Sequence, residues 1–272
     1  AALPPSCIEG TRMSSKKKIT VVVNKAWEYE PFFNAITNSV LRAKGLPDPT
    51  DIAEVSEPMR IPRAKMSLMN IDVVFRCVQN MMDPNVNKSN SEAKMVHMPG
   101  YLATDNVDLI ISVSTAESTP ELANILARSK DASINGSVII GNRFFMSNQR
   151  AVEGDHPESN LDVKKYVQYS DERFAILYRK INAVSSQVVK NFIPQKNAPA
   201  PKMFLHASDE LASVGVVNIV HYENYPKADE NSLKEFRKSG IADMPACLET
   251  THGIVSMAAN PDGMPPIPVI FV

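Results

Sequence analysis

The sequence predicts a single α/β domain with a mostly parallel central sheet flanked by helices. Apolar, β-branched runs that are typical of buried parallel strands alternate with stretches of helical periodicity. No internal repeat or long linker divides the 272 residues, and a hydrophobic content of 44% is enough for one large core. Such alternation favours parallel strands joined by helices, and ligands bind such sheets at the carboxyl ends of the strands.

The first half of the chain supplies three predicted strands and two predicted helices. ITVVV (19–23), residues 71–78 and VDLIISV (107–113) have the composition of strands. Residues 27–44 have helical spacing and are followed by Gly45, a typical stop signal. Residues 47–63, rich in proline and charge, are expected to form an excursion from the core. Pro120 and Glu121 are ordinary start signals for a helix at residues 120–128.

The second half continues the alternation. The turn-forming pair Asn135-Gly136 precedes a strand at residues 137–140, and residues 147–159 are predicted as a polar surface loop. A helix is predicted at 174–191, a strand within 211–220 and a short helix at 233–238, before Gly240. IPVIFV (267–272) is predicted as a buried parallel strand. A ligand site is therefore expected in the loops after Val23, Val113 and Val220 and just before Glu249.

Composition excludes several kinds of partner. Lys+Arg number 29 and Asp+Glu 30, so the net charge of −1 gives no global field that favours nucleic acid or an anionic membrane. No apolar run is long enough to span a bilayer. The cysteines are odd in number and widely spaced, which argues against a disulfide framework and a zinc cluster: Cys7, Cys77 and Cys247. We expect a cytoplasmic protein without a metal, with a secreted or periplasmic one as the open alternative.

The amino-terminal residues 1–17 are predicted to be a flexible extension of a domain that spans residues 18–272. They lack an apolar pattern and end in a basic run, and the sequence does not begin with Met, whereas Met13 stands just before SSKKK. Residues before Met13 are therefore either foreign to the natural start or the mature start after removal of a signal peptide.

Glu249 is the most informative single residue. It is the only charged residue between Leu248 and Ala259, in a segment predicted to be helical and followed by the apolar strand IPVIFV. A buried carboxylate needs a polar partner. Glu249 either caps the amino terminus of its own helix or binds a hydroxyl of a ligand.

Four motifs in a fixed order carry a family resemblance. They are ITVVV with NKAWE, DLIISV with STAES, NGSVIIGNRFF, and LETTHG before IPVIFV. From about Lys18 to Val272 the chain thereby resembles the nucleoside phosphorylase/nucleosidase superfamily, above all the methylthioadenosine/S-adenosylhomocysteine nucleosidases and their purine and uridine phosphorylase relatives. The ordered set carries the resemblance, since no single motif is specific. It implies a nucleoside phosphorylase-like fold, a nucleoside substrate, no cofactor and a homo-oligomer.

The resemblance assigns roles to two carboxylates. Glu28 falls where nucleosidases place the base that activates the attacking water; the alternative is a solvated acid of a first helical turn, as Glu30 could also be. Glu249 matches the glutamate that accepts hydrogen bonds from the ribose hydroxyls and stabilises positive charge on the sugar. Leu248 falls where relatives often have a methionine that packs against the ribose.

Further substrate-binding residues follow from the same resemblance. Ser114, Thr115 and Ala116 occupy the place of a glycine-containing turn, and Glu117 stands where a glycine is expected and would repel phosphate. Arg143 resembles an arginine found after the next strand; the alternative is an exposed arginine without a specific role. Relatives have an aromatic that stacks on the base where this chain has Tyr222 and Tyr225, which could instead shield the core. His221 and His252 are interpreted as structural.

One departure from the family concerns the leaving group. Relatives carry an Asp or Asn that protonates the departing base just beyond the strand equivalent to IPVIFV, and this sequence ends at Val272, so we expect it to be truncated there. Hydrolysis of the N-glycosidic bond is the favoured function. The alternatives are a phosphorylase with phosphate held by an arginine, and a non-catalytic relative that binds or stores a nucleoside. The candidate arginines are Arg60, Arg63, Arg76 and Arg143.

Overall fold

The structure is a computed structural model, and it describes most of the predicted strands and three helices. The described residues are 16–23, 28, 53–54, 63–68, 71–78, 107–128, 133–147, 166–168, 180, 201–205, 211–216, 225–249, 251–260 and 266–272. Two predicted helices, at 27–44 and 174–191, lie outside these residues, apart from Glu28 and Lys180, which are both helical. Residues 1–15, 148–159 and 217–224, for which an extension, a loop and the end of a strand are predicted, also lie outside them.

The larger sheet holds the first strand of the chain near its middle. Its six strands lie in the order β13-β5-β1-β4-β3-β2. Their bounds are β1 Lys17–Val23, β2 Ala53–Glu54, β3 Arg63–Leu68, β4 Ile71–Cys77, β5 Leu109–Val113 and β13 Val269–Phe271. The four strands from β13 to β4 are parallel, with Val21 opposite both Phe75 and Ile111, whereas β3 and β2 are antiparallel additions. The strands predicted at 19–23, 71–78, 107–113 and 267–272 are thereby confirmed, and the last is parallel as expected.

The second sheet carries the strand that ends just before Glu249. It has five strands in the order β6-β12-β11-β8-β9, of which β12, β11 and β8 are parallel to one another. Their bounds are β6 Glu117–Ser118, β8 Arg143–Ser147, β9 Tyr166–Gln168, β11 Leu211–Val216 and β12 Met244–Leu248. A parallel pair, β7 Ser133–Ile140 and β10 Pro201–Leu205, stands beside them. Gly141 after β7 exchanges two backbone hydrogen bonds with Phe271 of β13, which connects this part of the chain to the larger sheet.

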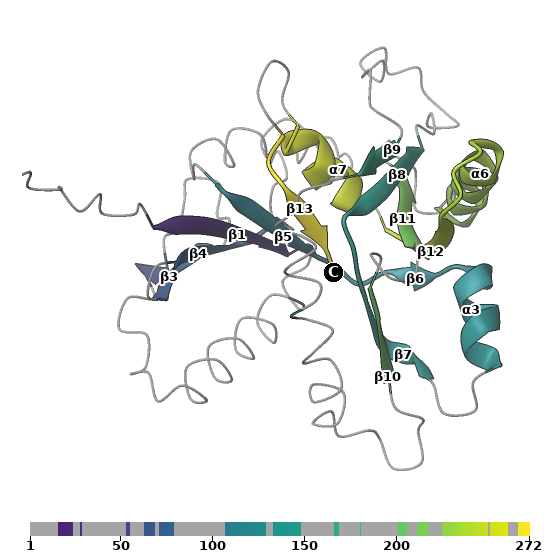
Figure 1. The fold of residues 1–272 in the computed structure, drawn as a ribbon, viewed down its shortest axis with the longest axis horizontal. Coiled ribbons are helices and arrows are strands. Elements are labelled where there is room, and N and C mark those ends of the chain that lie inside the picture. The colour runs from purple at the N-terminus through teal and green to yellow at the C-terminus, as the bar shows by residue number, and fades with distance from the viewer. Residues whose placement is uncertain are drawn as a thin grey trace, which may run out of the picture.

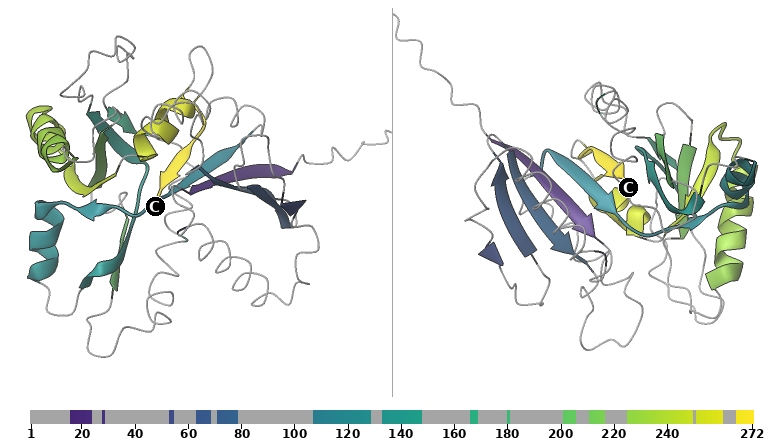
Figure 2. Two further views of the ribbon diagram at one scale, coloured as in Figure 1. Left: turned by 180° about the vertical axis from the view of Figure 1, so that it is seen from behind. Right: turned by 90° about the horizontal axis from the view of Figure 1, so that it is seen from below.

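The hydrophobic core lies where helix α7 (Thr251–Ala258) packs between the two larger sheets (Figures 1 and 2). Ile254, Val255 and Ala258 of α7 belong to one buried cluster with side chains from both sheets. The six-stranded sheet contributes Val22, Ile110 and Phe271, and the five-stranded sheet contributes Phe144. Helix α3 (Pro120–Ala127) starts at Pro120, as the sequence predicts. Its N-cap is Thr119, whose hydroxyl accepts from Leu122 N at 3.3 Å. Helix α6 (Tyr225–Lys238) packs against β11, β8 and β12.

Several elements differ from the prediction, among them α6, β12 and the start of α7. Helix α6 begins at Tyr225 rather than at residue 233, because its first two turns are polar and give no apolar periodicity. Strand β12 is not among the predicted strands, since MPACL contains a proline and small residues of low strand propensity. It ends at Leu248 and Glu249 N still donates to Val214 O at 2.9 Å, so Glu249 precedes the helix instead of lying within it.

Candidate active site

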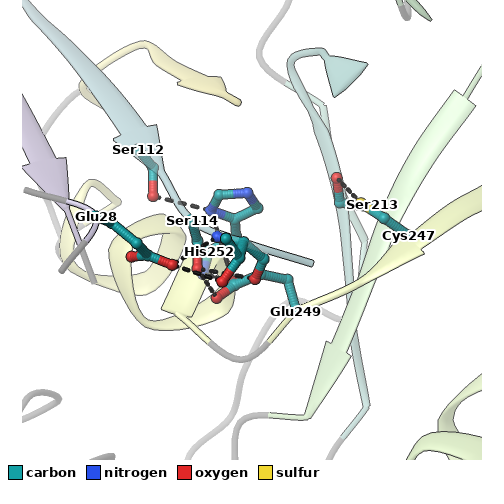
Figure 3. Close-up of polar contacts among 8 residues, drawn as sticks. Glu28, Ser112, Ser114, Ser213, Cys247, Glu249 and His252 are labelled. Atoms are coloured by element: carbon teal, nitrogen blue, oxygen red, sulfur yellow. Dashed lines mark hydrogen bonds and ion pairs between the residues drawn. The ribbon is translucent and has the colours of Figure 1, made fainter. Parts of the chain in front are cut away.

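The candidate site lies where the carboxyl ends of β1, β5 and β12 approach one another. Glu28 follows β1, the segment Ser114–Thr115–Ala116 follows β5, and Glu249 follows β12. The segment 114–116 leaves the larger sheet and enters β6 of the second sheet, so it passes from one to the other. Figure 3 shows the carboxylates of Glu28 and Glu249 pointing toward the same centre, beside Ser114 and His252. Three of the four loops named from the sequence thus meet here.

Thr115 holds the carboxylate of Glu28 in place. Glu28 Oε1 accepts two hydrogen bonds from Thr115, from the backbone N at 2.9 Å and from Oγ1 at 2.6 Å. Glu28 is 9% exposed. Hydrogen bonds to a charged acceptor are short and strong, and they compensate in part for removing the carboxylate from water. The solvated acid that was the alternative interpretation of Glu28 does not fit this burial.

Glu249 has a different partner on each carboxylate oxygen. Oε1 accepts from Ser114 Oγ at 2.6 Å, and Oε2 accepts from the backbone N of His252 at 2.5 Å. The second contact is that of a cap, because His252 lies three residues beyond Glu249, in the first turn of α7. The capping interpretation of Glu249 is therefore confirmed for one oxygen, and the other oxygen faces the loop of the candidate site; binding of a ligand hydroxyl stays a prediction.

Gly215 in β11 allows the backbone of Glu249 to pack directly against this strand. A Cβ placed on Gly215 would lie 1.8 Å from the carbonyl oxygen of Glu249 and 2.7 Å from Cζ of Phe144. The backbone of Glu249 thus occupies the space that any other residue at position 215 would need for its side chain. This close approach is a reason for glycine at that position.

His252 and Ser112 belong to the same group of contacts. The Nδ1 atom of His252 lies 2.9 Å from Ser112 Oγ and 3.6 Å from Glu249 Oε2. The ring is 2% exposed and lies near the rings of Phe144 and Phe271, with centroids 6.2 and 5.0 Å away. Burial lowers the pKa of His252, although the charges of Glu249 and Glu28 act in the opposite direction.

The sequence interpretation of His252 as structural agrees with its burial, but it did not foresee the contact with Glu249. The spacing of three residues between Glu249 and His252 was the available signal, because a side chain that caps a helix accepts from a backbone N–H two or three residues further along the chain. Ser112 gave no such signal, since a serine within an apolar strand is common.

The side chains of Arg143 and Leu248 have their contacts away from the two carboxylates, although Leu248 directly precedes Glu249 in the chain. Arg143 opens β8 at the amino end of the second sheet, where its Nη1 donates to Asp243 Oδ1 at 2.9 Å. Tyr166 OH donates to the other oxygen of Asp243. Leu248 is 8% exposed and packs in a core cluster that includes Phe145, Val214 and Phe236. Arg143 is therefore neither an exposed arginine nor a neighbour of Glu249.

The remaining sequence-predicted residues are less informative. Thr115, Ala116 and Glu117 are exposed, and Ser114 is half-buried. Tyr225 is the first residue of α6, and its side chain is outside the described structure, as is the whole of Tyr222. Among the described residues, no group of three or more His, Cys, Asp or Glu side chains could hold a metal ion. None of the described helices is long and apolar enough to cross a membrane.

This architecture is the nucleoside phosphorylase/nucleosidase fold. The chain resembles solved structures with that fold over most of its length. The methylthioadenosine/S-adenosylhomocysteine nucleosidase (MTAN) of Helicobacter pylori matches with a TM-score of 0.51 at 13% identity, over 94% of this chain and 86% of the other. A mutant of that enzyme, solved with 5′-methylthioadenosine in the active site, gives 0.51 at 14% identity, over 94% and 83%.

A second enzyme of the same organism gives a similar result. The native futalosine hydrolase of Helicobacter pylori strain 26695 matches with a TM-score of 0.51 at 12% identity, over 94% of this chain and 82% of the other. No protein-family model matches the sequence, and no curated protein matches it either. At these identities the likeness establishes the fold and leaves the reaction to be argued from the site.

Proposed function

We propose that this protein hydrolyses the N-glycosidic bond of a nucleoside. The observation that carries the proposal is the pair of buried carboxylates, Glu28 and Glu249, each hydrogen-bonded to one of two consecutive residues, Thr115 and Ser114. Pairs of carboxyl groups at the scissile bond are typical of glycosidic hydrolysis, and here we assign one to the attacking water and the other to the sugar. The solved nucleosidases with this fold support the same reaction class.

Glu28 is the proposed general base. Thr115 occupies its Oε1 twice, which fixes the orientation of the carboxylate, and Glu28 takes a proton from water as the oxygen of that water bonds to C1′ of the sugar. The bond from C1′ to the nucleobase breaks in the same step, and the nucleobase leaves with the electron pair of that bond. Positive charge develops on the sugar ring, and the negative charge of Glu249 stabilises it while binding a sugar hydroxyl.

Two features favour water over phosphate as the attacking group. Glu117 is exposed directly beyond the segment 114–116, so its charge would repel a phosphate ion there. Arg143 already pairs with Asp243 at the amino end of β8, so we no longer include it among the proposed substrate ligands. Stacking of the base on Tyr222 or Tyr225 remains part of the proposal and rests on the family resemblance alone.

The experiment follows base release from a panel of purine and pyrimidine nucleosides, with and without phosphate, by chromatography. The wild-type protein should release base without phosphate. Glu28→Gln should lower kcat by about 100- to 10,000-fold, the usual contribution of a general base. Glu249→Gln, which keeps the shape but loses the charge, should lower kcat by about 100-fold or more. Glu230→Gln on the exposed face of α6 is the matched control and should have no effect.

The outcomes separate the three possible functions of the fold. Base release only in the presence of phosphate would replace hydrolysis by phosphorolysis. Nucleoside binding without release under either condition would indicate a non-catalytic binding protein. Full turnover by Glu249→Gln would remove Glu249 from the mechanism and overturn the proposal in its present form.

A further inference from the structure

Strand β12, which ends just before Glu249, pairs with β11 in an irregular register. The register shifts by one residue between Ala212 and Ser213 of β11, so Ala246 of β12 has no residue opposite it in that strand. An extra residue of this kind is a β-bulge, and bulges beside functional sites re-aim a side chain. Glu249 is the third residue after this bulge.

The bulge decides to which side of the sheet the residues after it point. With the bulge, Leu248 lies opposite Val214, and both side chains belong to the buried cluster that α6 covers. Without the bulge the pairing would slip by one residue, and such a slip sends every side chain to the other face. Leu248 would then leave this cluster, and the carboxylate of Glu249 would leave the candidate site.

Thr119, the residue between β6 and α3, supplies hydrogen-bond donors to the bulge. Its backbone N donates to Ala246 O at 3.0 Å, and its hydroxyl lies 2.6 Å from Pro245 O and 3.1 Å from Ala246 O. Because the hydroxyl has one proton, we assign that proton to Pro245 O, the shorter contact, and the backbone N to Ala246 O. Thr119 is fully buried, so bulk water does not replace these donors.

We infer that Thr119 is a positioning residue for Glu249, because it fixes the bulge at Ala246 that directs this carboxylate into the candidate site. The inference rests on the proposed function, since it assumes that Glu249 acts on the sugar. Thr119 does not itself touch the substrate in this mechanism, and it is also the N-cap of α3, where Leu122 N donates to its hydroxyl. A loss of stability alone therefore does not test its role, and the turnover of folded protein has to be measured.

The test compares kcat of wild type, Thr119→Val and Thr119→Ser for adenosine, inosine, guanosine, uridine and cytidine, at a temperature where circular dichroism shows each protein to be folded. Valine keeps the shape of threonine without the hydroxyl, and serine keeps the hydroxyl. Thr119→Val should lower kcat by about 10- to 100-fold, the cost of displacing a catalytic group by about 1 Å, and Thr119→Ser should retain wild-type turnover. Thr251→Val is the matched control and should turn over normally, because Thr251 Oγ1 is buried without a hydrogen-bond partner among the described residues.

Glu249→Gln reveals whether Thr119 acts through this carboxylate. Added to Glu249→Gln, Thr119→Val should cost much less in kcat than it costs in wild type, because the carboxylate that it positions is already gone. Independent losses that multiply would overturn the inference. Wild-type turnover by folded Thr119→Val would overturn it too, since pairing of β12 with β6 would then fix the strand alone. If Thr119→Val does not fold, Thr119→Cys, a weaker donor of similar size, replaces it in the same comparison.

A binding measurement keeps this inference separate from the proposed reaction. The dissociation constants of the same nucleosides are measured by calorimetry for wild type, Thr119→Val, Glu249→Gln and the double variant. If wild type binds a nucleoside but releases no base, hydrolysis falls, and the inference stands when the two losses of affinity are non-additive and is overturned when they are additive. If base is released and Thr119→Val equals wild type, the inference is overturned and hydrolysis stands. If no nucleoside binds or reacts, both are overturned.

Discussion

The hydrogen bond between Ser112 and His252 joins strand β5 to helix α7 inside the core. Ser112 is fully buried, and its Oγ lies 2.9 Å from Nδ1 of His252. Ser112→Ala would leave a buried ring nitrogen without its partner, which costs about 1–3 kcal/mol. We expect a loss of that size in the free energy of unfolding, measured by urea denaturation.

The control for this prediction is Ser118→Ala, which removes a hydroxyl that is only half-buried. It should change the free energy of unfolding by less than about 0.5 kcal/mol, as is usual for surface substitutions. Equal stability of Ser112→Ala and wild type would mean that the contact contributes nothing and that His252 is held by its packing alone.

At the scale of single residues, the sequence points to the candidate site in two ways. Glu249 is the only charged residue in an apolar segment, whereas Glu28, Ser114 and Thr115 are assigned by the family resemblance after two predicted strands. Arg143 was grouped with them because it also stands in a motif of that resemblance, GNRFF. Arg143 does follow the strand predicted at 137–140, which is the end of β7, but it also begins β8, where it pairs with Asp243.

At the scale of elements, the close approach of β11 to the backbone of Glu249 depends on one glycine, Gly215. The Cβ of Gly215→Ala would meet the backbone oxygen of Glu249 at 1.8 Å, and backbone atoms cannot move aside as a flexible side chain can. The strand or the chain after β12 must then shift. We expect a loss of about 2 kcal/mol or more in the free energy of unfolding, typical of overpacking, together with reduced activity because Glu249 moves.

Gly240→Ala separates a steric clash from backbone strain. Gly240 has φ of 75°, and a Cβ added there would have no atom within 4 Å, so alanine meets only the conformational penalty, about 1 kcal/mol. Both variants should be less stable than wild type, but Gly240→Ala should retain full activity. A Gly215→Ala protein with normal activity would show that the Glu249 backbone adjusts without displacing its carboxylate.

The predictability of elements followed their apolar content. Strands β1, β5 and β13 consist almost entirely of β-branched and apolar residues, and each was predicted. Strand β12 and the first two turns of α6 lack such patterns, and tertiary contacts stabilise them instead. Leu233 and Phe236, near the carboxyl end of α6, supply its buried contacts, which is why only that end was visible in the sequence.

At the scale of the whole molecule, the sequence predicted a mostly parallel sheet but could not show how its strands divide. The carboxyl ends of β1, β5 and β12 meet although Val23 and Glu249 lie far apart in the chain. Pairing between such distant segments depends on shape and packing, which no local pattern records. The division into two larger sheets with α7 between them therefore had to come from the structure.

The pH dependence of stability is also a property of the whole molecule, because two groups on different helices, His252 of α7 and Asp229 of α6, act on it in opposite directions. Burial lowers the pKa of His252 below its ordinary value of 6.5, so the unfolded state takes up a proton first and stability falls as the pH drops through about 6.5. Burial, and then the charge of Glu117, raise the pKa of Asp229 from 3.8 to about 6. Below pH 6 the folded state therefore binds the extra proton, and stability rises as the pH drops toward 3.8.

These opposing effects predict a shallow pH profile for the wild type that two variants would separate. Asp229→Asn removes the group that gains stability in acid, so its unfolding free energy should fall more steeply than that of wild type between about pH 7 and 5. At neutral pH it should be more stable by about 1 kcal/mol or less, because the half-buried carboxylate is screened by solvent. His252→Asn should be less stable at every pH but should gain stability on acidification. Urea denaturation from about pH 4.5 to 7.5 measures both, and parallel profiles for all three proteins would refute the two assignments.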